Sequence, residues 1–159
     1  MKNLYTLLTL LFTASIVAQT HEIIKHDGKK MEVNFIKIEN NLVYYSDLNS
    51  MEERKISKYA IAQLKEKSKT DSQIISEKIN PTGKSDYKKV VILNESETIG
   101  LKRTDTLNYF FGKIKGQSKL SLLEMGERRL KENAALQGNQ FIVILSNKTS
   151  SLEAVTYTY

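Results

Sequence analysis

The chain of 159 residues contains no cysteine, and this absence limits how it can hold a fold together. Without thiols there is no disulfide, no cysteine-ligated zinc site and no iron–sulfur cluster. Any folded part must therefore be stabilised by an apolar core. The hydrophobic share of 40% and the charged share of 26% are ordinary for globular proteins, so the composition supplies such a core.

Residues 1–19 predict a targeting segment rather than part of the fold. A basic start is followed by an uncharged apolar run over 4–17, the pattern of a secretory signal peptide. The run is shorter than the roughly 20 residues that a membrane-spanning helix needs. Cleavage fits after Ala18 or after Gln19, and an uncleaved anchor is the alternative. We predict an exported protein that is periplasmic, on the outer surface or secreted, with no transmembrane segment in the mature chain.

Residues 20–66 predict a small all-β module. Asp27-Gly28 and Asn40-Asn41 are hairpin-turn signals between runs rich in β-forming residues. Alternation changes parity near Phe35-Ile36, which predicts a bulge. Ser57 is placed to cap a short helical turn. The order of these features resembles the small SH3-like or Sm-like barrels of bacterial secreted proteins, which implies a β-barrel-like module.

Residues 67–89 predict a linker, because small polar residues, lysine and the breaker cluster Pro81-Thr82-Gly83 dominate it. Its net charge is +3 within a chain total of +6, whereas 20–66 is neutral and 90–159 carries +2. The cationic excess therefore concentrates in the linker. This pattern is usual for a soluble connector, and it also leaves contact with an anionic envelope polymer open.

Residues 90–159 predict an α+β module. A strand is expected over 89–93, and Ile99-Gly100-Leu101 is expected to begin a second. A long helix is expected from Ser118 or Ser121 to Gln137, closed by Gly138. An unbroken apolar run over 141–145 predicts a buried strand, and alternation over 153–159 predicts a last one. The fold class predicted for the whole chain is α+β: a β-barrel-like module followed by a β-α-β-β module with one long helix.

This second module resembles the YbjQ/RcsF-like envelope domain. The resemblance rests on Ile99-Gly100, on Arg129-Leu130-Lys131 with Ala134-Ala135, and on Gly138-Asn139 leading into the apolar strand. The family usually has Gly-Ala-Asn or Gly-Ala-Asp at that turn, so one position departs. The resemblance implies a compact domain used in assembly and envelope sensing, with ring-like oligomers in the YbjQ branch. The heavy-metal binding suggested for some relatives and the disulfides of the RcsF branch do not transfer to a chain without cysteine.

One segment combines aromatic and cationic residues, which are the types that supply contact energy at protein interfaces. We interpret it as a candidate contact loop for a protein partner, a glycan or a lipid headgroup region. The competing interpretation is an ordinary strand with one aromatic row in the core and its cations in solvent. The candidate residues are Lys102, Arg103, Tyr109, Phe110, Phe111, Lys113 and Lys115.

No catalytic or metal-ligating pattern is visible. The two histidines, His21 and His26, are expected to be solvated at a strand edge, and no pair of carboxylates has a spacing that requires a shared site. We predict a non-enzymatic envelope protein without a cofactor that acts as a protein-interaction, assembly or adaptor module. Its expected partner is itself or another envelope protein, and not a nucleic acid. The alternative is a binding module for an envelope glycan or other polyanion.

Overall fold

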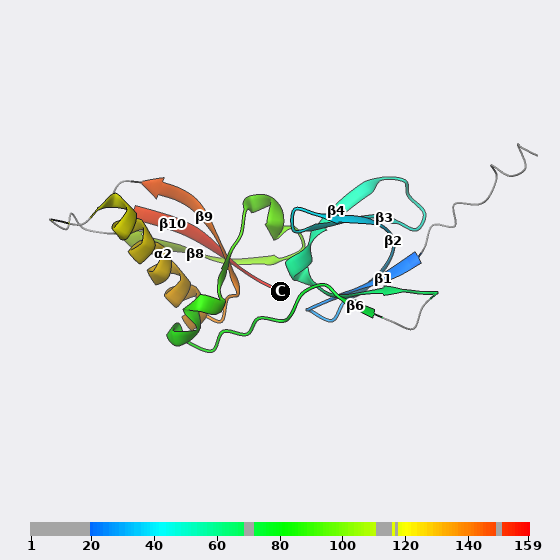
Figure 1. The fold of residues 1–159 in the computed structure, drawn as a ribbon, viewed down its shortest axis with the longest axis horizontal. Coiled ribbons are helices and arrows are strands. Elements are labelled where there is room, and N and C mark those ends of the chain that lie inside the picture. Colours follow the sequence, from blue (N-terminus) through cyan, green and yellow to red (C-terminus); the bar gives the residue numbers. More distant parts are fainter. Residues whose placement is uncertain (1–19, 69–71, 111–115, 117, 149–150) are drawn as a thin grey trace, which may run out of the picture.

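The computed structural model describes residues 20–68, 72–110, 116, 118–148 and 151–159. It confirms the α+β class, with ten strands in two sheets and one long helix over these residues (Figure 1). The predicted signal peptide, 1–19, lies outside the described residues. No helix among the described residues has the length and apolarity to cross a bilayer.

The first sheet has six antiparallel strands in the order β4-β3-β2-β1-β5-β6. Both predicted turns form. Gly28 has φ +85°, and Asn40 and Asn41 have φ +49° and +62°, the positive values that such hairpin turns require. The strands are β1 (Thr20–Lys25), β2 (Lys30–Glu39), β3 (Leu42–Asp47), β4 (Glu53–Ser57), β5 (Ile61–Glu66) and β6 (Ser72–Ile74).

Two finer features of this sheet also agree with the sequence. The register of β2 against β3 shifts between Phe35 and Lys37, where the bulge was predicted. The Ser57 hydroxyl accepts the Tyr59 N–H at the start of η1 (Lys58–Ala60), the short turn between β4 and β5. No pairing among the described strands joins the two ends of this sheet, so its barrel-like closure stays a prediction.

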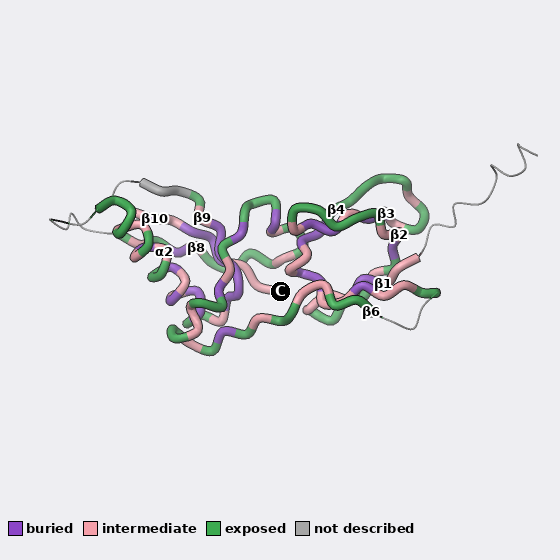
Figure 2. Tube along the Cα trace, in the orientation of Figure 1, coloured by how far each residue is buried: buried purple, intermediate pink, exposed green. Residues whose placement is uncertain are grey.

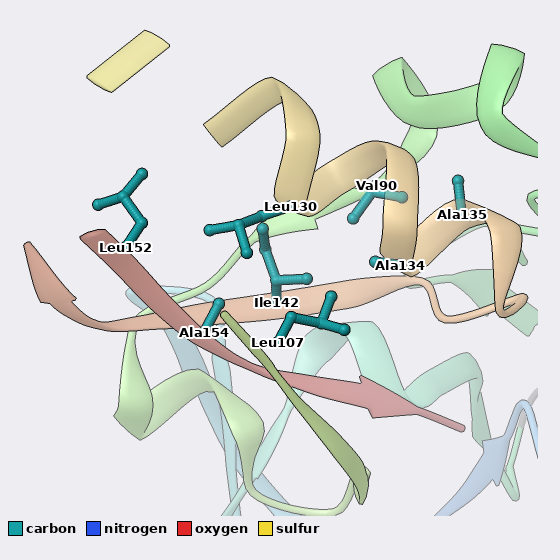
Figure 3. Close-up of a cluster of buried hydrophobic side chains, with 8 residues drawn as sticks. All are labelled: Val90, Leu107, Leu130, Ala134, Ala135, Ile142, Leu152 and Ala154. Carbon is teal, nitrogen blue, oxygen red and sulfur yellow. The ribbon is translucent and has the colours of Figure 1, made fainter. Parts of the chain in front are cut away.

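The second sheet has the order β7-β9-β10-β8, with β7 parallel to β9 and the other pairs antiparallel. Helix α2 (Lys119–Leu136) covers one face, capped by Ser118 and followed by Gly138 at φ +74°. Leu130 and Ala134 of α2 pack on Leu107, Ile142 and other apolar residues of the sheet (Figure 3). The strands are β7 (Val91–Ile92), β8 (Lys102–Phe110), β9 (Phe141–Lys148) and β10 (Ser151–Thr158).

The structure corrects two strand predictions in this module. The strand expected over 89–93 is only the two residues of β7. Ile99-Gly100, expected to begin a strand, is a turn that follows η3 (Glu95–Thr98), and β8 begins at Lys102. Gly100 has φ +88°, a left-handed conformation incompatible with a regular strand.

The segment predicted as a linker packs against both modules. Strand β6 extends the first sheet, and η2 (Lys84–Lys89) packs against α2, with the Arg128 guanidinium 5.1 Å from the centre of the Tyr87 ring. Between β6 and η2, residues 75–83 run as a strap from the first sheet to the second module (Figure 1). Ile75 N–H donates to Ala62 O, and the Ile79 N–H donates to the Tyr159 hydroxyl.

A third apolar cluster lies where the two sheets meet. Phe141, fully buried, contacts the rings of Tyr59 and Tyr159 with centroids 5.6 and 5.4 Å apart. Leu93 and Val143 complete its buried part, and the C terminus lies between the two sheets (Figures 1 and 2). Polar bonds add to the contact: Ser57 N–H donates to Ile99 O.

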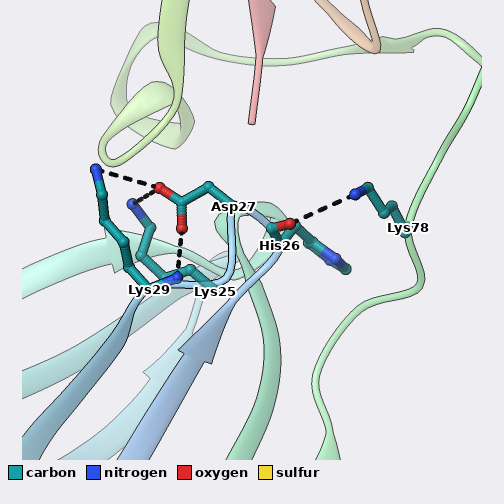
Figure 4. Close-up of polar contacts among 5 residues, drawn as sticks. All are labelled: Lys25, His26, Asp27, Lys29 and Lys78. Atoms are coloured by element: carbon teal, nitrogen blue, oxygen red, sulfur yellow. Dashed lines mark hydrogen bonds and ion pairs between the residues drawn. The ribbon is translucent and has the colours of Figure 1, made fainter.

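A corner of the first sheet faces this junction (Figure 4). Asp27 forms ion pairs with Lys25 and Lys29, each at 3.5 Å, and Lys78 of the strap reaches the His26 carbonyl. The His26 ring lies 4.5 Å from the Tyr159 ring, and its Nε2 lies 2.9 Å from the Ser76 hydroxyl. The prediction of a solvated His26 is therefore wrong: the side chain is partly buried because the ring of Tyr159, the residue after β10, packs against it.

Candidate functional site

The candidate contact residues that the structure describes all belong to β8. Lys102 and Arg103 begin the strand and are exposed, whereas Tyr109 and Phe110 end it. Phe110 has 76% of its surface exposed, and Tyr109 packs against the cluster beneath α2. Phe111, Lys113 and Lys115 lie outside the described residues.

Within one chain the strand separates the two halves of the candidate. Arg103 and Tyr109 are six residues apart in an extended segment, which corresponds to roughly 20 Å. The cations and the aromatic residues therefore do not form one cluster, as the sequence had suggested. The aromatic end is divided as well, because Tyr109 takes the helix-covered face and Phe110 the opposite one.

β8 is one of the two edge strands of the second sheet. Its pairing with β10 determines which of its backbone N–H and C=O groups point away from the sheet. On the far side of the sheet, Val91 N–H donates to Gln140 O and Leu93 N–H to Ile142 O. The peptide groups of Ile142 therefore face β7. Because a strand directs successive residues to alternate neighbours, those of Phe141 and Val143 face β10.

The same alternation continues across β10. Val155 is the partner of Val143, so its peptide groups face β9 and those of Ala154 face β8, where Leu107 is the partner. Leu107 thus bonds inward, and Tyr109 does so for the same reason. The N–H and C=O groups of the intervening residues point away from the sheet. These residues are Thr106, Asn108 and Phe110, and no described strand lies beyond them.

The first residues of β8 do not continue this alternation, because a bulge interrupts the pairing with β10. The buried hydroxyl of Thr156 stabilises this bulge. The register against β10 shifts between Val155 and Tyr157. Thr156, fully buried, donates to Asp105 O at 3.1 Å and accepts the Asp105 N–H at 3.0 Å. Its oxygen also lies 2.7 Å from the Thr104 hydroxyl. The bulge therefore has its hydrogen bonds satisfied within the chain and ends the regular edge at Thr106.

This bulge is tied to the turn after α2. Thr104 donates to the Asn139 side chain at 3.0 Å, and Gln137 reaches Asp105 at 3.4 Å. Asn139 and Thr156 are both buried, and sequence reasoning missed the network. No local pattern marks it, because its members come from β8, the turn after α2 and β10. Every such contact is already internal, so the network positions β8 rather than offering a binding group.

Other polar features of the described residues lie away from this edge. A cavity of about 390 Å³ lies beside the strap, lined by Glu77, Lys78, Ile79, Asn80 and Lys89. Burial, followed by the nearby Lys78 ammonium, lowers the pKa of His26 from its ordinary value. No three histidine, aspartate or glutamate side chains among the described residues are grouped to hold a metal ion.

Comparison with protein-family models, with curated proteins and with solved structures gave no match. The YbjQ/RcsF-like and SH3-like resemblances therefore stay predictions from the sequence.

Proposed function

We propose that this chain is an exported envelope protein that acts by protein contact, and that it assembles with itself through the 90–159 module. The proposal rests on the outer edge of β8. There the outward backbone groups of Thr106, Asn108 and Phe110, every second residue of the strand, have no strand partner among the described residues. Such an edge is a template for pairing with another chain. Phe110, largely exposed at its end, adds apolar surface that association would cover.

The rest of the proposal extends the sequence predictions. The basic and apolar start of the chain supports export, and we propose a periplasmic, outer-surface or secreted location. The barrel-like assignment of 20–66 is supported by β5 returning beside β1 after the turn η1. In this proposal the first module and the strap pack against part of one face of the second sheet, and the β8 edge contacts a second copy of the chain.

Sedimentation velocity of residues 20–159 over a range of concentrations tests the assembly role. We expect a reversible, concentration-dependent oligomer that is insensitive to added metal ions. Cross-linking in the native envelope tests the wider proposal of function by protein contact. Recovery of the chain joined to itself supports assembly, and recovery of one reproducible envelope protein supports an adaptor.

A monomer at all concentrations that binds an anionic glycan in a salt-sensitive manner would overturn the proposal in favour of polyanion binding. In that case neutralising Lys102, Arg103, Lys113 and Lys115 should weaken the binding, because each removes one cationic contact.

A further inference from the structure

The edge of β8 also defines how two copies would meet, and this inference rests on the proposed assembly function. We infer that a second copy of this chain pairs antiparallel with β8 over Thr106–110, with Asn108 opposite Asn108 of the other copy on a two-fold axis. The two four-stranded sheets then become one continuous sheet. Both α2 helices lie on the same side of it, because the axis is perpendicular to the sheet.

The backbone supports this register. The outward peptide groups belong to Thr106, Asn108 and Phe110, as the pairing across the sheet requires. With Asn108 at the axis, Thr106 of one copy faces Phe110 of the other. Each of these residues then exchanges both of its backbone hydrogen bonds with its opposite residue, as in any hydrogen-bonded antiparallel pair. All outward groups of the segment are satisfied at once.

The side chains match in the same register. Leu107 of one copy is opposite Tyr109 of the other on the helix-covered face, where both already pack against the apolar cluster. On the other face Phe110 is covered by Thr106. The segment from Thr106 to Phe110 contains no charge, glycine or proline, so no like charges meet across the axis.

The bulge favours this register over the one in which the two-fold axis passes through Thr106. Moving the axis to Thr106 would place Asn108 opposite Thr104, whose hydroxyl is held by Thr156 and Asn139 inside the bulge. A bulged residue does not continue a regular ladder. It would also bring the exposed cations Lys102 and Arg103 into the pairing segment.

The edges of the first sheet are less suited to a second copy. β4 carries Glu53, Arg54 and Lys55 in sequence, and its last N–H, that of Ser57, already donates to Ile99 O. β6 has only three residues. Charge and shortness are the usual ways in which proteins protect a sheet edge. β7, the other edge of the second sheet, has only two residues. The uncharged half of β8 is therefore the described edge that fits self-pairing.

The absence of native cysteine makes a disulfide test clean. In a hydrogen-bonded antiparallel pair the opposing Cα atoms lie about 5.5 Å apart, within the range that a disulfide spans. Asn108→Cys in the 20–159 chain should therefore form a disulfide-linked dimer under mild oxidation. The matched control is Asn49→Cys, an exposed asparagine in the turn between β3 and β4, which should cross-link only at the background level.

The register has its own test. Thr106→Cys and Phe110→Cys should each stay mostly uncross-linked alone, whereas an equal mixture should give the mixed dimer. Cross-linking of Thr106→Cys with itself at the level of Asn108→Cys would overturn the register. Cross-linking of Asn108→Cys no better than Asn49→Cys would overturn the β8 pairing.

Two charge variants test the axis without a thiol. Asn108→Lys and Asn108→Glu should each dimerise several-fold more weakly than the native chain, because residue 108 meets its own copy. Their mixture should recover the dimer, and failure to recover it counts against the inference. Circular dichroism of each variant establishes that the fold is retained.

The outcome separates this inference from the proposed function. If the native chain oligomerises in sedimentation but Asn108→Cys does not cross-link, assembly stands and β8 pairing is wrong. If the native chain is a monomer at every concentration, both self-assembly and this inference are wrong.

Discussion

The two faces of the second sheet are covered in different ways. One face is covered by α2, a neighbour in sequence, through aliphatic residues such as Leu130, Ala134 and Ile142. Part of the other face, around Phe141, packs against the first sheet and the strap through the rings of Tyr59 and Tyr159 and through polar bonds. The first cover is a local core, and the second joins segments far apart in the chain.

The two sheets therefore depend on each other at the junction and not beneath α2. A change beneath α2 should affect mainly the second sheet, because that cluster contains no residue of the first sheet. A change at the junction should affect both sheets.

The sharpest comparison is Phe141→Ala with Leu130→Ala. Both side chains are fully buried, and each truncation should cost about 3 to 4 kcal/mol of the free energy of unfolding because it leaves a cavity. Hydrogen exchange should separate them. Phe141→Ala should speed the exchange of β1 and β5 amides as well as β9, whereas Leu130→Ala should leave β1 and β5 protected. Equal behaviour of the two variants would mean that the junction carries no more coupling than the helix core.

Gly100→Ala tests how closely the two sheets meet. A Cβ at Gly100 would lie 2.6 Å from Ile56 Cγ1, and the residue has φ +88°. Overpacking and backbone strain together should lower the free energy of unfolding by about 2 to 4 kcal/mol.

The matched control is Gly138→Ala, where φ is +74° and no atom lies within 4 Å of the added Cβ. It should cost only about 1 kcal/mol, the strain of a left-handed residue. Urea unfolding of both variants measures the difference, and equal losses would show that the Ile56 contact relaxes freely.

Thr156→Val tests the bulge that ends the regular edge of β8. The substitution removes a fully buried hydroxyl and leaves the Asp105 N–H without its partner, at a cost of about 1 to 3 kcal/mol. Thr156→Ser keeps the hydroxyl and should restore the hydrogen bonds, losing only the methyl contact. Urea unfolding measures both, and a Thr156→Val variant as stable as Thr156→Ser would contradict the role of the hydroxyl.

The smallest effect is a pH dependence at the junction. The pKa of His26 is lowered in the folded protein, chiefly by burial and then by Lys78, so the folded state binds its proton less readily than the unfolded state. The contribution of His26 to the free energy of unfolding is therefore fully present above its ordinary pKa of 6.5. It is lost as the pH falls from there toward the pKa of the folded state.

His26→Gln retains a side-chain N–H for Ser76 but does not titrate. Thermal unfolding between pH 7.5 and 5 (a range of roughly one unit or more on each side of the ordinary histidine pKa) should show a shallower decline for the variant. An identical decline in both proteins would assign the pH dependence to other groups.

Local elements of both modules could be predicted because their signals lie within a few residues. Asn40-Asn41 adopts the two positive φ values that its hairpin turn requires, and the Phe35-Ile36 parity change marks a real bulge. Ser118 and Gly138 delimit α2 through capping, which depends only on neighbouring backbone groups. The segment interpreted as a candidate contact loop is a strand as far as Phe110, which was the competing interpretation, and its division into opposite ends and faces was not predicted.

Local sequence patterns were enough to predict the α+β class, the two hairpin turns, the long helix and the dependence on apolar cores in a chain without cysteine. The packing of the two modules, which no local pattern specifies, makes Ile99-Gly100 a turn against Ile56 and places Tyr159 over His26. The order of the strands in the second sheet leaves β8 at an edge. These features join residues separated by tens of positions. Their free energy comes from contacts between elements that no local pattern encodes, so they follow from how the elements pack and not from any one segment.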